Sequence, residues 1–244
     1  MTTGEHPPPF SLDIDVERQP DNTTCGPTCL QAVYRYYGDN IGLTDVISEV
    51  PTLPTGGTLA VHLANHALAR GYRATLFTYN LTLFDPTWFA PGAPPMVERL
   101  EAQRGAKRDA KLALATDAYL DFVTAGGRLR LDDLTGDLLE TYLSRGAPLL
   151  TGLSATYLYR CAREMDDRYD DTRGEPAGHF VVISGYDADR REVLVRDPLH
   201  DHPGQWGTAY RVAFERLTSA IMLGIVTYDA NVLVIEPGDR KDSR

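Results

Sequence analysis

The chain has 244 residues, with 24 Lys and Arg against 34 Asp and Glu, so its formal net charge is −10. This balance argues against a nucleic-acid-binding protein, which neutralises phosphates with clustered Lys and Arg. Hydrophobic residues make up 43% of the sequence and charged residues 24%, proportions that favour a globular fold with a buried core.

The cysteines and the N-terminal segment indicate a reducing compartment. Three cysteines, Cys25, Cys29 and Cys161, form neither a disulfide framework nor a zinc-ligand pattern. The segment 1–10 is polar and proline-rich, without the apolar stretch of a signal peptide. No window approaches the ~18 consecutive apolar residues of a membrane helix. We therefore expect a cytoplasmic protein with no membrane span, no bound metal and no cofactor.

Helices dominate the first part of the chain. Apolar residues recur at near-helical spacing from 25 to 37, and Gly38 ends the pattern. A second helix is predicted at 44–50, with Thr44 as its N-cap. A third is predicted at 57–70, and residues 72–79 then alternate as a strand does.

The middle of the chain has a different character. Prolines in the segment 85–95 remove hydrogen-bond donors, so no regular structure is expected there. One polar helix is predicted at about 96–123, and the segment 85–130 is interpreted as an insertion resembling a lid. An amphipathic helix follows at 132–144.

Strands dominate the second half. Short β-branched or apolar runs separated by turn residues predict strands at 148–153, 179–186, 192–197, 209–214 and 231–236. The sequence DADRR joins two of them as a tight hairpin. Helices followed by strands predict an α+β fold with an antiparallel sheet. We expect one domain at 11–236, with flexible tails at 1–10 and 237–244.

Cys25 is the candidate nucleophile. It directly precedes Gly26 and Pro27, and proline is favoured in the first turn of a helix. The thiol is thus predicted at a helix N-terminus, where the helix dipole favours a thiolate. Gln19, six residues earlier, carries a side-chain amide that could stabilise an oxyanion together with the Cys25 backbone N–H.

His179 and Asp197 are candidates for the base and the residue that orients it. His179 begins one predicted strand and Asp197 ends the next, so both lie at the open end of the hairpin. A carboxylate there can hold the imidazole tautomer that accepts a proton from the thiol.

Three sequence blocks resemble a known family. The first is Gln19, five residues, and then CGPTCL from Cys25; the second is GHFVV at 178–182; the third is VRDP at 195–198. Together they resemble the double-glycine leader peptidases that process bacterial bacteriocin precursors, and more closely their stand-alone peptidase-like relatives. The residue before the nucleophile, often acidic in that family, is Thr24 here.

The resemblance implies a papain-like fold, in which an N-terminal nucleophile helix packs on a C-terminal antiparallel sheet. It also implies a cysteine peptidase or amidohydrolase that cleaves a peptide or isopeptide bond through a thioester. Cys25 would be the nucleophile, His179 the base, Asp197 the orienting acid and Gln19 the oxyanion donor. We expect the substrate to contact four further residues: Gly26, Gly178, Tyr157 and Tyr159. The charged loop 160–176 is the expected substrate-facing loop.

Other functions remain open on the sequence. The same thioester could be transferred to an amine, which would make the protein a transpeptidase or an amide-forming enzyme. A catalytically silent peptide-binding module is a second alternative. His62 and His66 have the i, i+4 spacing of metal ligands, but no third ligand is evident and we expect them to be structural. The stretch 200–202 (His-Asp-His) is a candidate lining of the site or a solvated loop.

Overall fold

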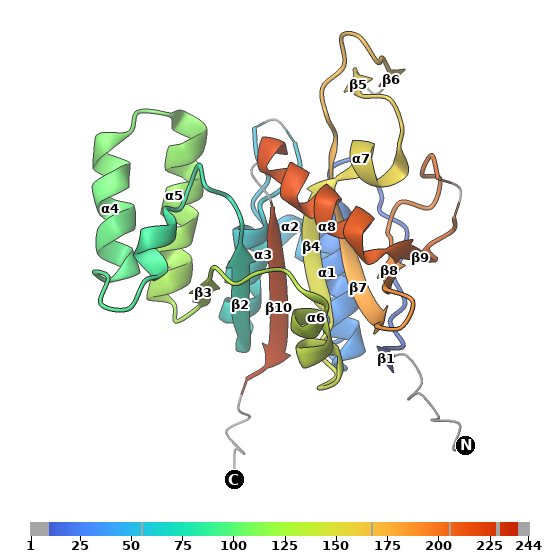
Figure 1. Ribbon diagram of the computed structural model, residues 1–244, viewed down its shortest axis with the longest axis horizontal. Coiled ribbons are helices and arrows are strands. Elements are labelled where there is room, and N and C mark those ends of the chain that lie inside the picture. The colour runs from blue at the N-terminus through green and yellow to red at the C-terminus, as the bar shows by residue number, and fades with distance from the viewer. Residues whose placement is uncertain (1–9, 55, 167, 205, 228–229, 239–244) are drawn as a thin grey trace.

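A mixed sheet forms the centre of the computed structural model, which describes residues 10–54, 56–166, 168–204, 206–227 and 230–238 (Figure 1). The order of its strands is β3-β2-β10-β4-β7-β8-β9, and β1 pairs with β7. Neighbours are antiparallel except for the parallel pair β2–β3. The strands are β1 (Phe10–Ser11), β2 (Tyr72–Thr78), β3 (Arg128–Arg130), β4 (Leu149–Ser154), β7 (Gly178–Asp187), β8 (Glu192–Arg196), β9 (Ala209–Ala213) and β10 (Asn231–Pro237).

Helices cover both faces of this sheet (Figure 1). On one face lie α1 (Cys25–Tyr36), α2 (Leu43–Glu49), α3 (Ala60–Ala69), α4 (Met96–Ala106) and α5 (Ala110–Thr124). On the other lie α6 (Gly136–Leu143), α7 (Ala155–Tyr159) and α8 (Phe214–Leu223). The hairpin of α4 and α5 stands at the edge of the molecule beside α3, away from α7 and α8 (Figure 1).

Strand β7 shows why the sheet needs cover on both sides. Phe180 and Val182 join the hydrophobic cluster that includes α1, whereas Val181 and Ile183 join the cluster that includes α8. Successive side chains of a strand point to opposite faces, so this continuous apolar run is buried from both directions. Helix α1, which begins at Cys25, is therefore packed directly against β7, the strand that carries His179.

The α+β class and the packing of an N-terminal helix on a largely antiparallel sheet confirm the predicted fold. The sheet is not confined to the second half of the chain, however. Strand β2 lies beside β10, with Leu76 opposite Leu233, and β3 extends the edge in parallel to β2. Pairing of such distant segments depends on buried side chains that pack together only in the folded protein.

The helix predicted at 96–123 is two helices, which corrects the sequence-based boundary. The helical conformation is interrupted between Ala106 and Ala110. The Asp109 side chain accepts a hydrogen bond from the Leu112 backbone N–H at 2.7 Å. Asp109 is thus the N-cap of α5, and a capping aspartate favours the start of a new helix.

Two further local predictions were wrong. The helix expected from residue 44 begins at Leu43 with Gly42 as its N-cap, so Thr44 lies inside the first turn. The segment 85–95 is not wholly irregular, since it contains the 3-10 helix η1 (Pro86–Phe89). The Asp85 carboxylate accepts a hydrogen bond from the Thr87 N–H at 2.9 Å, and Pro86 suits the first turn because it needs no partner for an N–H.

Several elements were not predicted. They include β1, β3, α7, α8 and the 3-10 helix η2 (Gly224–Thr227). A further one is the small hairpin of β5 (Glu164–Met165) and β6 (Arg168–Tyr169), which lies within the charged loop 160–176. This hairpin projects beyond the end of the sheet, above α7 (Figure 1). Asp167, part of the acidic run in that loop, is outside the described residues.

Within the described residues, no helix has both the length and the apolar character needed to cross a membrane. The expected N-terminal tail lies outside the described residues except for Phe10, which belongs to β1. Of the expected C-terminal tail, Pro237 ends β10 and Gly238 is the last described residue.

Candidate active site

Cys25 is the first residue of α1, at the end of a well-ordered turn. The Asp21 carboxylate accepts hydrogen bonds from the backbone N–H and the hydroxyl of Thr23, both at 2.7 Å. These two bonds lower the pKa of Asp21. Among the described residues no side chain caps α1, and Pro27 in its first turn has no N–H. The positive end of the helix dipole therefore faces the thiol without a competing carboxylate cap.

Gly26, an expected substrate contact, is closely packed in the structure. A Cβ atom at this residue would lie 2.8 Å from the Cγ2 atom of Thr58 and 3.3 Å from the Phe180 ring. Any larger residue would push the start of α1 away from the sheet. Cys29, one turn later, is fully buried, and its thiol donates to the Phe180 carbonyl at 3.3 Å. Burial raises the pKa of Cys29, so this thiol stays protonated.

His179 and Asp197 are brought together by the β7–β8 hairpin. Nε2 of His179 lies 2.8 Å from Oδ1 of Asp197, and both side chains are buried, with 5% and 0% exposed. The Cys25 thiol lies near enough to the His179 imidazole to contribute to raising its pKa. Because Nε2 is occupied by Asp197, the nitrogen left for the thiol is Nδ1. The three side chains are thus brought together from α1, β7 and the end of β8.

The Asp197 carboxylate is held by four donors. Oδ1 accepts from His179 and from the Leu199 backbone N–H at 2.9 Å, and Oδ2 accepts from the hydroxyls of Tyr159 and Tyr210, both at 2.7 Å. Burial by itself would raise the pKa of Asp197. The nearby His179 and the hydroxyl donors outweigh burial and lower the pKa to about 2.

The pKa of His179 is shifted in the direction opposite to that of Asp197. Burial would lower the pKa of the imidazole, but the Asp197 charge and hydrogen bond, with a smaller contribution from Cys25, raise it to about 10. The charged imidazolium is therefore favoured near neutral pH. Such a group stabilises a thiolate beside it and can donate a proton to a leaving amine.

Gln19 lies next to this group of residues. Its backbone N–H donates to the Pro198 carbonyl at 3.0 Å, which ties the loop before α1 to the segment after Asp197. Its side chain is buried, and Nε2 donates to the Asp21 carbonyl at 2.7 Å. A primary amide has two N–H bonds, so one remains for a second acceptor.

A cavity of about 340 Å³ opens beside His179. Gln19, Gly178 and Tyr159 line it, as does Tyr169 from the β5–β6 hairpin of the loop 160–176. Cys25 is not among the lining residues and is 7% exposed, whereas His179 lines the cavity. No described residue of the segment 85–130 lines the cavity, so the insertion does not act as its lid in this structure.

The two tyrosines expected to bind substrate occupy different environments. Tyr159 lines the cavity, but its hydroxyl is committed to Asp197. Tyr157, 43% exposed, instead lines a separate hollow of about 300 Å³ with Leu223 and Val226. The two residues lie two positions apart on the short helix α7, so their side chains diverge.

A group of aromatic residues lies behind the Asp197 carboxylate, and of these Tyr210 was not identified from the sequence. His202 is buried and stacks on Tyr159, with ring centroids 4.8 Å apart and planes 6° apart. Trp206 and Tyr210 lie against the same group, 5.0 Å apart. Tyr210 sits opposite Val195 on the neighbouring strand, a pairing that needs the β8–β9 register to be known. Of the stretch 200–202, all three residues line a second hollow beside the cavity.

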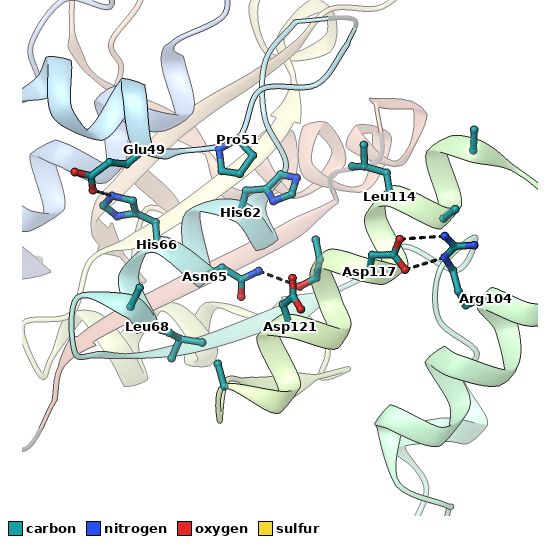
Figure 2. Close-up of a pocket in the computed structure, with 15 residues that line it drawn as sticks. Glu49, Pro51, His62, Asn65, His66, Leu68, Arg104, Leu114, Asp117 and Asp121 are labelled. Atoms are coloured by element: carbon teal, nitrogen blue, oxygen red, sulfur yellow. Dashed lines mark hydrogen bonds and ion pairs between the residues drawn. The ribbon is translucent and has the colours of Figure 1, made fainter.

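His62 and His66 are not a metal site. Nε2 of His66 lies 2.9 Å from the Glu49 carboxylate (Figure 2). Nδ1 lies 2.8 Å from the Tyr34 hydroxyl, so both nitrogens are occupied. Burial lowers the pKa of His62. No group of three or more His, Cys, Asp or Glu side chains among the described residues is placed to hold a metal ion. The two histidines line a groove of about 1000 Å³ between α3 and α5, remote in sequence from Cys25.

Comparison with known proteins supports the resemblance seen in the sequence. Residues 110–219 match the model of the Peptidase_C39 like family, a stretch that includes His179 and Asp197 but not Cys25. No curated protein matches the sequence.

Several solved structures are similar at low identity. A C39-like peptidase from Bacillus anthracis has a TM-score of 0.48 and 15% identity, over 94% of this chain and 98% of that one. A double glycine motif protease from an AMS/PCAT transporter, in complex with the leader peptide, has a TM-score of 0.45 and 13% identity over 94% and 97%. Xylellain, a cysteine protease from Xylella fastidiosa, has a TM-score of 0.44 and 16% identity over 95% and 86%.

The family match spans 110 of the 244 residues and includes two of the three sequence blocks, GHFVV at 178–182 and VRDP at 195–198. Over this stretch the chain is similar to the Peptidase_C39 like family.

Proposed function

We propose that the protein is a cysteine peptidase that cleaves a peptide or isopeptide bond through a thioester on Cys25. The observation that carries this proposal is that His179, hydrogen-bonded to the buried Asp197, lies near the Cys25 thiol at the start of α1. A histidine that contacts both a thiol at a helix N-terminus and a buried carboxylate has the arrangement needed for nucleophilic catalysis. The family match supports the same class of enzyme.

In the proposed mechanism the Cys25 thiolate attacks the substrate carbonyl carbon. The oxygen that becomes negative is stabilised by the Cys25 backbone N–H and by the free N–H of the Gln19 amide. The His179 imidazolium donates its Nδ1 proton to the nitrogen of the leaving amine, and the C–N bond breaks. Neutral His179 then takes a proton from water, which attacks the thioester, and Cys25 leaves as a thiolate while the acid product departs.

In this cycle Asp197 fixes the tautomer of the His179 imidazole. Its Oδ1 atom accepts from Nε2, so the neutral imidazole carries its proton on Nε2 and offers a lone pair at Nδ1. The carboxylate also stabilises the imidazolium that alternates with the neutral ring.

Alkylation of Cys25 tests the proposal without a known substrate. Intact-mass labelling with iodoacetamide from about pH 5 to 8 should modify Cys25 at the acidic end, because the imidazolium stabilises its thiolate. Cys29 is buried, and burial raises the pKa of Cys161, with Glu164 adding to the effect, so neither competes at that end. The His179→Ala variant should lose the labelling at acidic pH.

His62→Ala is the matched control, since this histidine lies outside the site and should leave labelling unchanged. Slow labelling in the wild type, with no dependence on His179, would contradict the proposal and favour a silent peptide-binding module. Once a cleaved peptide is found, an added amine distinguishes hydrolysis from transfer. A conjugate would identify a transpeptidase, and hydrolysis alone at high amine concentration would identify a peptidase.

A further inference from the structure

Two phenol hydroxyls from different elements converge on one oxygen of Asp197. Tyr159 comes from α7 and Tyr210 from β9, and each hydroxyl lies 2.7 Å from Oδ2. Burial, followed by the Asp197 charge, raises the pKa of both phenols, so both remain protonated donors. Hydrogen bonds from neutral donors to a carboxylate are stronger than those between neutral groups.

These hydroxyls complete the coordination of a carboxylate that has no access to solvent. Asp197 is 0% exposed, and an ionised carboxylate has about four lone-pair sites. Two sites on Oδ1 are filled by His179 and the Leu199 N–H, and two on Oδ2 by the tyrosines. Without the hydroxyls, Oδ2 would be buried and unsatisfied, which is costly for a charged group.

The tyrosines also restrict how the carboxylate can turn. With only the Oδ1 contacts, the group could rotate about its Cβ–Cγ bond and exchange its two oxygens. Donors on Oδ2 from two separate elements oppose this rotation. The Tyr159 ring is itself held by His202, which stacks on it, and Trp206 packs against both Tyr159 and Tyr210.

We propose that Tyr159 and Tyr210 form a hydroxyl clamp that fixes Asp197 and thereby aims Nδ1 of His179 at Cys25. Both are positioning residues, because they act on the reacting atoms only through Asp197 and His179. The inference rests on the proposed function of this site and adds two residues to it, one of which the sequence suggests as a substrate contact.

Among the described residues, the titratable groups that interact with Asp197 are His179 on β7, Tyr159 on α7, Tyr210 on β9 and Cys29 on α1, with His202 stacked on Tyr159. A change in the pH profile after removal of a tyrosine hydroxyl is interpreted within this group.

The test compares Tyr159→Phe, Tyr210→Phe and the double variant with the wild type. Each substitution removes one hydroxyl and keeps the ring. The measured quantity is the pH below which iodoacetamide labelling of Cys25 declines, called the acid limb. It should move upward by about one pH unit in the double variant, and less in each single variant. The reason is that a less firmly held carboxylate stabilises the imidazolium less, so the thiolate beside it takes up a proton at higher pH.

Tyr79→Phe is the matched control, because its buried hydroxyl has no hydrogen-bond partner among the described residues. A general loss of packing would lower labelling equally at all pH values and leave the limb in place. An unchanged limb in the double variant, confirmed as folded by circular dichroism, would overturn the clamp. If the double variant does not fold, the single Tyr159→Phe variant at the cavity wall gives the same comparison.

A second measurement does not need a reactive thiol, so failure of the clamp and failure of the peptidase proposal can be told apart. In the Cys25→Ala background, the proton on Nε2 of His179 should give a resolved NMR resonance that exchanges slowly with water. In the double tyrosine variant that proton should exchange at least tenfold faster. Equal exchange in both proteins would refute the clamp, whether or not the wild type cleaves peptides.

Discussion

The imidazole of His179 lies between a thiol and a carboxylate, and each ring nitrogen has a distinct partner. Nε2 meets Asp197 at 2.8 Å, which leaves Nδ1 for Cys25. The ring is 5% exposed, so its charge state is set by these neighbours more than by solvent. Gln19 is held beside them by its own backbone bond to the Pro198 carbonyl. The chemistry of the site therefore depends on a few short contacts between side chains from separate segments.

Replacing Gln19 tests its role at the residue scale. Gln19→Ala removes one proposed oxyanion donor, so kcat/KM for a cleaved peptide should fall by about 10²–10³-fold, as for the loss of one such donor elsewhere. Steady-state kinetics would measure this, and alkylation of Cys25 should change little because the thiol and His179 are untouched. Gln31→Ala, a buried glutamine on α1, is the matched control. A comparable loss of activity in both variants would show that Gln19 acts through folding alone.

At the scale of elements, the hairpin of α4 and α5 is the part of the chain least connected with the site. Asp109 starts α5 by capping the Leu112 N–H, and Gly105 lies in the last turn of α4, where an added methyl group would meet no atom within 4 Å. The hairpin packs on α3 and lines the groove shown in Figure 2. Its stability can therefore be altered without touching the residues around Cys25.

Asp109→Ala should lower the free energy of unfolding by about 1 kcal/mol, because the cap of α5 is lost. Gly105→Ala should raise it by up to about 1 kcal/mol, because glycine disfavours a helix interior. Urea denaturation would measure both changes. Labelling of Cys25 should match the wild type in each variant. A shift of its pH profile in either variant would show that the hairpin is coupled to the site after all.

At the scale of the whole molecule, the His179–Asp197 pair links folding to pH. The pKa of Asp197 is lowered to about 2, so its contribution to stability is complete above the usual value near 3.8 and is lost as the pH falls towards 2. The pKa of His179 is raised to about 10, so its contribution is complete below 6.5 and is lost as the pH rises through 10. Both contributions are present together between about pH 4 and 6.5.

Asp197→Asn should therefore lose the most stability, relative to the wild type, at about pH 5. The difference between the two proteins should shrink towards pH 9, because His179 loses its proton in the unfolded chain above about 6.5, and towards pH 3, because Asp197 takes up a proton in the unfolded chain below about 3.8. Urea denaturation of both proteins at pH 3, 5 and 9 would measure it. A difference that is constant across the three pH values would contradict the proposed charge states of the pair.

Much of the fold could be predicted because it depends on local patterns. The helix at Cys25 follows from the spacing of its apolar residues, and the β7–β8 hairpin follows from two apolar runs around a short turn. Local cues failed at 107–109, where a single aspartate outweighs a continuous helical pattern. They also missed α8, although its apolar residues recur at helical spacing.

The sequence by itself determined that Cys25 begins a helix and that His179 and Asp197 lie at one end of a hairpin, because turns and periodicity act over a few residues. Only the tertiary structure decided which nitrogen of His179 meets Asp197, and that Tyr159 and Tyr210 bind its second oxygen. It also decided that Gly26 serves packing and that His66 is occupied by Tyr34 and Glu49. These contacts join residues far apart in the chain, and their geometry is set by strand register and packing, which no local pattern contains.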